Sequence, residues 1–271
     1  MKILYSAFEC NPLRGSDAFV GWSWAKQASI TNEVHILTSD HNREDIESYK
    51  KSEDIGGVFH YIGLPKAMKK ILKGRKGYFL SYLLWQRYAY RYAKKLNKEI
   101  GFDVAHHISI ADFRVIGYLW KLNIPFIFGP VGGGQETPVE LTDYVASYRK
   151  QEWVRSMLNT LALLRPSYKK GIRRAAEVFV SNDETINAIR KQIGGDVRLT
   201  QMCELGVDAT YLKTRESLHH ETKNTVHIIV SGRMMYRKGL ELLMDACPCI
   251  QTSIPWVVDV YGGGHQEADV R

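Results

Sequence analysis

Short apolar runs, each bounded by glycine or polar residues, alternate along the chain with stretches whose apolar residues recur at helical spacing. The runs predict strands at residues 2–6, 34–38, 58–63, 102–105, 124–128, 176–181, 197–201, 226–230 and 256–261. The helical spacing predicts helices at residues 19–30, 44–51, 65–98, 138–174, 184–193 and 240–246, and one that starts near Asp112. This alternation predicts an α/β fold with a parallel sheet.

Two of the long helical segments raise questions of packing. In residues 138–174, Trp153, Met157, Leu161 and Leu164 recur at helical spacing and predict the buried face. In residues 65–98, lysines and arginines are interleaved with aromatic residues. That segment is either a helix that lies on an anionic membrane or a domain helix with a solvated basic face and a tyrosine-rich packed face.

The strand at 226–230 is followed by a turn that carries Arg233 and Lys238 before the helix at 240–246 begins. In open parallel sheets, ligands bind where a strand ends and its helix starts, because the helix N-terminus offers unpaired N–H groups. A guanidinium and an ammonium in the same turn favour a phosphorylated anion.

Composition narrows the class of protein. The 271 residues carry a formal net charge of +8, which favours anionic ligands, nucleic acid or anionic membrane surfaces as partners. Nucleic acid is the weakest of these, because no binding-module signature occurs.

No apolar run is long enough for a membrane helix and no signal peptide is evident, so we expect a cytoplasmic protein, with peripheral attachment at the inner face of the cell membrane as an option. The four cysteines show neither zinc nor disulfide spacing, and we expect free thiols.

Two glycine-containing loops follow predicted strands. The first has Gly15 and Gly21 but no GxGxxG fingerprint, which argues against a dinucleotide oxidoreductase. The second, after residues 124–128, has three consecutive glycines, Gly132, Gly133 and Gly134, which permit close approach of a backbone or positive φ angles.

Several motifs, taken in order, resemble those of one family. They are the run from Ser6 through Cys10, Pro12, Gly15-Ser16-Asp17 and Gly21-Trp22-Ser23-Trp24-Ala25, then the His106-His107 pair, GPVGGGQ at 129–135, ELGVD at 204–208, SGR at 231–233 with Lys238-Gly239, and YGGG at 261–264. Together they resemble the motifs of the GT-B glycosyltransferases of family 4, which are retaining and use nucleotide sugars. Asp17 stands where that family usually has Glu, Phe19 replaces a Gly, and Ile108 stands where many members have a second His.

The resemblance implies a GT-B type α/β fold. Residues 1–208 would form a complete N-terminal Rossmann-like domain on the acceptor side, and residues 209–225 a polar linker. Residues 226–271 would form an incomplete Rossmann-like nucleotide-sugar domain, so we expect a chain truncated within its C-terminal domain. The linker contains His219-His220-Glu221, but an exposed segment without further ligands predicts no metal site.

The resemblance also assigns roles to residues. His106 or His107 would face the donor sugar as the catalytic histidine. The donor-binding residues would be Gly15, Ser16, Arg233, Lys238, Gly262 and Gly263, and the acceptor-side or cleft loops would contain Asp17, Gly132, Gly133, Gly134 and Gln135. No metal and no cofactor is implied, because the nucleoside diphosphate sugar is a co-substrate.

The implied activity is transfer of a sugar, with retention, to a glycan or lipid-linked acceptor in polysaccharide or cell-envelope glycan synthesis. The alternative is a non-catalytic remnant or split subunit that needs a C-terminal partner. We expect the 271-residue chain alone to lack transfer activity, and residues 226–271 to be marginally stable, with Ile228, Val230, Val257 and Val258 less buried than their pattern demands.

Overall fold

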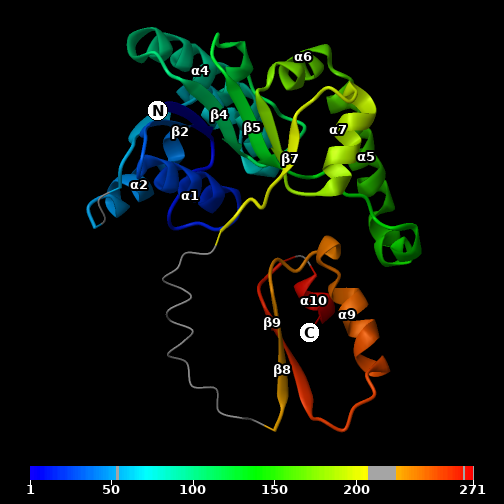
Figure 1. Ribbon diagram of the computed structural model, residues 1–271. Helices are drawn as coiled ribbons and strands as arrows, with labels where there is room; N and C mark the ends of the chain where they lie inside the picture. The colour runs from blue at the N-terminus through cyan, green and yellow to red at the C-terminus, as the bar shows by residue number, and fades with distance from the viewer. Residues whose placement is uncertain (53–54, 207–223, 265, 271) are drawn as a thin grey trace. The chain divides into compact units, whose positions relative to one another are not determined.

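A computed structural model describes residues 1–52, 55–206, 224–264 and 266–270 (Figure 1). The chain divides into two compact units. Unit 1 contains Met1–Gln135 and Leu158–Gly206, and unit 2 contains Glu136–Met157 and Val207–Arg271. Residues 209–223 of the expected linker, including the His219-His220-Glu221 cluster, lie outside the described residues.

Unit 1 is built on a seven-stranded parallel sheet with the order β3-β2-β1-β4-β5-β6-β7. Its strands are β1 (Lys2–Ala7), β2 (Glu33–Ser39), β3 (Val58–Ile62), β4 (Val104–Ser109), β5 (Phe126–Val131), β6 (Glu177–Val180) and β7 (Leu199–Gln201). Each predicted strand of this unit is present, and the predicted parallel α/β sheet is confirmed.

Helices cover both faces of this sheet. They are α1 (Asp17–Ser29), α2 (Arg43–Tyr49), α3 (Lys66–Ile71), α4 (Gly74–Ile100), the end of α5 (Arg149–Leu164), α6 (Pro166–Arg174) and α7 (Asp183–Ile193), with short 3-10 turns η1 (Asp40–Asn42) and η2 (Leu119–Lys121). In β1, Ile3 and Tyr5 pack in the core beneath α1 and α2, whereas Leu4 packs in the core beneath α4, α6 and α7. Because successive strand residues point to opposite faces, one strand supplies both cores.

The predicted helical segment 65–98 is two helices, α3 and α4, separated at Leu72-Lys73. In α4, Tyr82 and Trp85 are fully buried, whereas its lysines and arginines are exposed or undescribed. This is the packed, tyrosine-rich face expected of a domain helix.

Two expectations for helical segments are wrong. No helix starts near Asp112; this residue instead forms an isolated β-bridge with Gly132, and the segment continues irregularly to η2. The stripe predicted to be buried in residues 138–174 is exposed, with Trp153 at 66% and Leu161 at 51%. The adjacent stripe faces inward instead, because the Asn159 side chain donates a hydrogen bond to the Gly133 carbonyl and Leu163 joins the core.

The β-structure of unit 2 is a parallel pair of strands, β8 (Val226–Ser231) and β9 (Trp256–Tyr261). The other elements are η3 (Val139–Leu141), η4 (Asp143–Tyr148), the first part of α5, η5 (Tyr236–Lys238), α9 (Leu240–Ala246), η6 (Cys247–Cys249) and α10 (Glu267–Val270). As expected, Ile228, Val230, Val257 and Val258 are not fully buried. Tyr236 in η5 stacks on Tyr148 with ring centroids 4.2 Å apart, and its hydroxyl donates to Glu152 at 2.8 Å.

The four cysteines are free thiols, as expected. Within the described residues, no helix is both long enough and apolar enough to cross a bilayer.

Candidate functional site

The order of strands in unit 1 reverses between β1 and β4. From β1 the chain adds β2 and β3 on one side, and then returns to place β4, β5, β6 and β7 on the other. The connections that follow β1 and β4 therefore leave the sheet in opposite directions, and the region outside the carboxyl ends of these strands, here called the β1–β4 crevice, is where open α/β sheets bind ligands. This edge is the candidate site of unit 1.

A buried carboxylate, Glu9, lies just beyond the end of β1. Its Oε1 lies 2.9 Å from Nε2 of His41 and accepts a hydrogen bond from the Tyr78 hydroxyl at 2.5 Å. Its backbone carbonyl accepts from the Ser109 hydroxyl at 2.5 Å, at the end of β4. The cluster therefore connects residues that follow or end β1, β2 and β4 with the start of α4.

The environment of Glu9 keeps its side chain ionised. Burial alone would raise the pKa of this carboxyl group, but the hydrogen bonds from His41 and Tyr78 and the charges of His41 and Arg14 bring the pKa below its usual value. Burial and the neighbouring carboxylate raise the pKa of the Tyr78 hydroxyl, so this group remains a donor. The Glu9 carboxylate is therefore a fixed negative charge, oriented by His41 and Tyr78.

The loop before α1 contains the predicted residues Gly15, Ser16 and Asp17. Ser16 has φ 59° and ψ −140°, and among the described residues it is the sole non-glycine with positive φ. Asp17 Oδ1 accepts a hydrogen bond at 2.9 Å from the backbone N–H of Ala111, which follows β4. Asp17 thus ties together the two loops that border the crevice, and Gly15 lies exposed beside it.

The predicted glycine loop after β5 is used largely for packing. A Cβ atom on Gly132 would lie 2.5 Å from the Ser181 hydroxyl, and one on Gly134 would lie 2.7 Å from Cα of Thr185. Gly133 has φ 105°, and its N–H donates to the Gln135 side chain at 3.1 Å. These glycines let the loop lie directly on the start of α7, and their cleft role stays a prediction.

The two predicted catalytic histidines lie inside β4 rather than after it. The strand was expected to end at Ala105, but it runs to Ser109, so His106 and His107 are buried on opposite faces. His106 Nε2 lies 2.7 Å from the Gly129 carbonyl, and His107 Nε2 lies 3.1 Å from the Tyr82 hydroxyl. Burial lowers the pKa of His106 to about 4; burial, and secondarily the charge of His106, lower the pKa of His107 to about 3. Both rings are neutral at pH 7, and their catalytic role stays a prediction.

In unit 2 the predicted donor-binding residues lie on the connections that follow β8 and β9. Arg233 and Lys238 are both exposed and both follow β8. A Cβ atom on Gly262 would lie 1.8 Å from the Gly232 carbonyl, and the Gly263 carbonyl accepts a hydrogen bond from the Met234 N–H at 3.0 Å. The glycines after β9 therefore hold its loop against the loop that carries Arg233.

Sequence reasoning missed Glu9, His41 and Tyr78. Glu9 and His41 each lie just past the end of a strand, and a polar residue in that position can face a ligand. This criterion was applied only to His106 and His107. Glu204 was also missed: burial, and to a lesser extent the nearby Asp17 charge, raise its pKa although Ser181 donates to it. Among the described residues, no group of three or more His, Cys, Asp or Glu side chains is placed to hold a metal ion.

No model of a known protein family and no curated protein matches this chain. Among solved structures, it is similar to sucrose-phosphate synthase from Thermosynechococcus elongatus, with a TM-score of 0.50 and 14% identity over 96% of this chain and 61% of that one. A UDP-glucose: anthocyanidin 3-O-glucosyltransferase in complex with UDP matches with a TM-score of 0.46 and 12% identity, over 95% of this chain and 66% of that one. The fold is of the GT-B type. This agrees with the predicted fold class, and the chain spans about three-fifths of the length of the first of these proteins.

Proposed function

We propose that this chain is a glycosyltransferase polypeptide that acts with a nucleoside diphosphate sugar as donor and a glycan or lipid-linked hydroxyl as acceptor, with retention of configuration. The observation that carries this proposal is the position of two exposed cations, Arg233 and Lys238, on the connection after β8 in a protein of GT-B fold. Membership of family 4 and a role in polysaccharide or cell-envelope glycan synthesis are part of the same proposal and rest on the sequence motifs.

The cations after β8 would act on the leaving group. As the bond between sugar and diphosphate breaks, negative charge grows on the diphosphate while the sugar becomes oxocarbenium-like. A guanidinium can hold two phosphate oxygens at once, and an ammonium adds a second positive charge. Arg233 and Lys238 would thus stabilise the departing diphosphate more than the intact donor, which lowers the barrier.

The edge of unit 1 would serve the acceptor. The ionised Glu9 carboxylate can accept a hydrogen bond from an acceptor hydroxyl, and its own orientation is fixed by His41 and Tyr78. Asp17 would hold the β1 and β4 loops at the spacing this requires, through its bond to Ala111. Gly15 and Ser16, in the same loop as Asp17, would instead contact the donor through their backbone N–H groups.

Ligand-detected NMR with UDP, GDP and a panel of nucleotide sugars tests the donor site. We expect Arg233→Ala and Lys238→Ala each to weaken binding by about tenfold or more, because a hydrogen bond to a charged group contributes roughly 1.5–3 kcal/mol. Arg237→Ala is the matched control, since Arg237 is an exposed cation of the same connection whose charge acts on Glu152. Equal affinity in the Arg233 and Lys238 variants and the parent would remove the assignment.

A second candidate is favoured by the exposure of the β8–β9 pair, in which Ile229 is 67% exposed. In this case the chain is non-catalytic by itself and requires a partner polypeptide to extend that sheet. Incubation of the purified chain with radiolabelled donors separates the two proposals: transfer of label by the chain alone contradicts the second, and donor binding without transfer favours it.

We also propose peripheral attachment to anionic membranes through the region 65–98. Ile71 is 82% exposed and lies in sequence between lysines 69, 70 and 73. We expect sedimentation with anionic vesicles that weakens as salt rises, since each basic residue near such a surface contributes about 1 kcal/mol. Ile71→Ser should reduce it, whereas Ile30→Ser, which alters an equally unpartnered isoleucine at the end of α1 (67% exposed), should not. Equal sedimentation with neutral vesicles would refute the proposal.

A further inference from the structure

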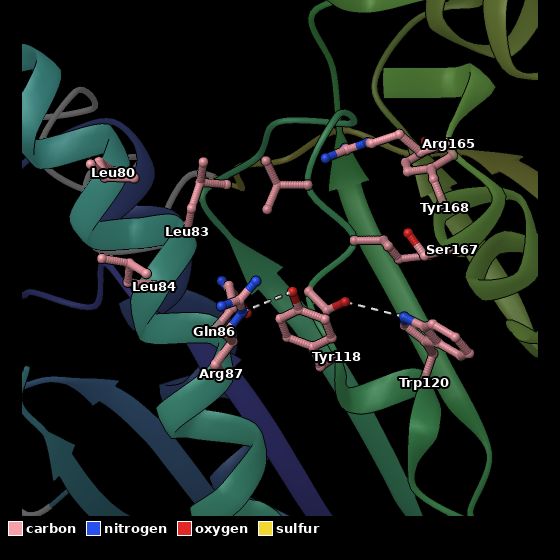
Figure 2. Close-up of a pocket in the computed structure, with 13 residues that line it drawn as sticks. Leu80, Leu83, Leu84, Gln86, Arg87, Tyr118, Trp120, Arg165, Ser167 and Tyr168 are labelled. Atoms are coloured by element: carbon pink, nitrogen blue, oxygen red, sulfur yellow. Dashed lines mark hydrogen bonds between the residues drawn. The ribbon is translucent and has the colours of Figure 1, made fainter. Parts of the chain in front are cut away.

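Unit 1 contains a pocket of about 300 Å³ that is lined by none of the residues proposed to bind donor or acceptor. It lies between α4 and the start of α6, over the irregular segment that contains η2 (Figure 2). This volume is at the lower end of the range for pockets that bind small molecules.

The walls of the pocket differ in character. Leucines of α4 and Val115 and Ile116 supply apolar surface, and the polar side chains include Gln86, Arg87, Arg165, Ser167 and Tyr168. All thirteen lining residues belong to the described part of the chain; two are arginines and none is acidic. The pocket therefore presents a net positive charge beside an apolar surface.

Two buried polar atoms in the lining have no hydrogen-bond partner: Gln86 Nε2 and the Tyr168 hydroxyl. Gln86 is 3% exposed and Tyr168 is 1% exposed, so water cannot readily reach these groups. A buried donor without an acceptor destabilises a protein and is uncommon in folded proteins. An acceptor in the pocket can reach these groups only when the two side chains turn toward it.

The absence of a Cβ at Gly117 preserves space for the amide of Gln86. A Cβ there would lie 2.6 Å from Gln86 Oε1 and 3.3 Å from Nδ1 of His107, and Gly117 also has φ +65°. A side chain at position 117 would therefore displace the Gln86 amide.

The start of α6 adds further donors. Arg165 precedes the helix without a side-chain cap, and Pro166 occupies its first turn. The N–H groups of Ser167 and Tyr168 consequently lack acceptors within the helix and lie at its positive end. Figure 2 shows the Arg165 guanidinium extending toward α4, the helix that carries the Gln86 and Arg87 side chains.

We propose that this pocket binds a small organic anion, a phosphate or carboxylate with an apolar body. Its charged group lies between Arg87 and Arg165 at the start of α6, its oxygens accept from the Gln86 and Tyr168 side chains once these turn toward it, and its apolar part packs on Leu80, Leu83 and Leu84. The site is separate from the residues proposed to bind donor and acceptor. Its test requires neither.

Calorimetric titration with octyl phosphate and octanoate, below their micelle concentrations, tests the ligand class. We expect both to bind, and inorganic phosphate and octyl glucoside to bind at least about tenfold more weakly, because each lacks either the apolar body or the charge. Stronger binding of one anion identifies the preferred head group. Equal binding of octyl glucoside would contradict the charge requirement, and absence of binding by both octyl anions would overturn the proposal.

Variants locate the site and separate a ligand role from a structural one. Tyr168→Phe removes a hydroxyl that has no partner, so it should raise the thermal midpoint of the free protein while weakening octyl phosphate binding about fivefold or more. Arg165→Gln should weaken binding to a similar degree, whereas Arg174→Gln, a matched exposed arginine at the other end of α6, should leave it unchanged. A lower midpoint for Tyr168→Phe with unaltered binding, or equal losses for Arg165→Gln and Arg174→Gln, would overturn the assignment.

Discussion

The β1–β4 pair of unit 1 and the β8–β9 pair of unit 2 are both built from six-residue strands, but they differ in burial. Every residue of β4 is buried, whereas β8 contains no fully buried residue. Both pairs are parallel and rich in branched apolar residues. The difference comes from neighbours: β1 and β4 have a strand on each side and helices over both faces, while β8 and β9 pair only with each other among the described residues. An apolar run therefore predicts a strand, but its burial depends on elements far away in the sequence.

The sharpest test of this comparison is a pair of identical substitutions. Ile36 in β2 is 0% exposed and Ile229 in β8 is 67% exposed. We expect Ile36→Ala to lower the free energy of unfolding by about 2–5 kcal/mol and Ile229→Ala by less than about 0.5 kcal/mol. Urea denaturation followed by circular dichroism measures both. Similar losses at the two positions would show that β8 is covered in solution.

A second prediction concerns acid. Because burial keeps His106 and His107 neutral, with pKa values of about 4 and about 3, the unfolded chain binds more protons than the folded one as pH falls below the ordinary histidine pKa of 6.5. The stabilisation is therefore present above pH 6.5 and is lost as pH falls from there through about pH 4 for His106 and about pH 3 for His107.

We expect His106→Gln to reduce the dependence of unfolding free energy on pH in that interval by up to about 1.4 kcal/mol per pH unit. Denaturation series at pH 7, 6 and 5 would measure the slope. Replacement of the exposed His227 in β8 by Gln is the unit 2 counterpart. A parent slope retained by His106→Gln would show that this ring is not buried in its neutral form.

How much the sequence could reveal differs between elements. The alternation of short apolar runs, such as the one that contains Ile3, Leu4 and Tyr5, with helical segments was sufficient to predict the parallel sheet. The end of β4 could not be found in the same way, since polar His106 and His107 look like a strand end but are buried by aromatic neighbours such as Tyr5 and Tyr82.

The inward face of α5 and the Glu9 cluster escaped prediction for a related reason. The polar Asn159 side chain faces inward, where it donates a hydrogen bond to the Gly133 carbonyl. The pattern of hydrophobic residues cannot predict such a bond. Glu9, His41 and Tyr78 meet through three different elements, so their proximity depends on the order of strands. The turn with Arg233 and Lys238 was predicted correctly in position because one local βα connection forms it.

The smallest effect that we predict concerns residues with positive φ in the loops of the two units. Among the described residues, those of unit 2 with positive φ are glycines, including Gly239 at 68°, whereas unit 1 has Ser16 at 59° in addition to its positive-φ glycines. Ser16→Gly should raise the free energy of unfolding by about 1 kcal/mol, and Gly239→Ala should lower it by about the same amount. Thermal denaturation by calorimetry measures both changes. A loss of stability in Ser16→Gly would show that the serine side chain, rather than strain, dominates at that position.

The bonds that close the β1–β4 crevice also bear on the order of events in folding. Asp17 and Ala111 are 94 residues apart, Ser109 and Glu9 are 100 apart, and the Trp24 indole donates to the Glu204 carbonyl across 180 residues. Contacts of such long separation form late, after local helices, because the intervening chain must first be ordered. On a ribosome, the crevice cannot exist until β4 and the residues after it have emerged, so a nascent chain that contains only β1 to β3 carries the strained Ser16 loop without the strand that completes its binding edge.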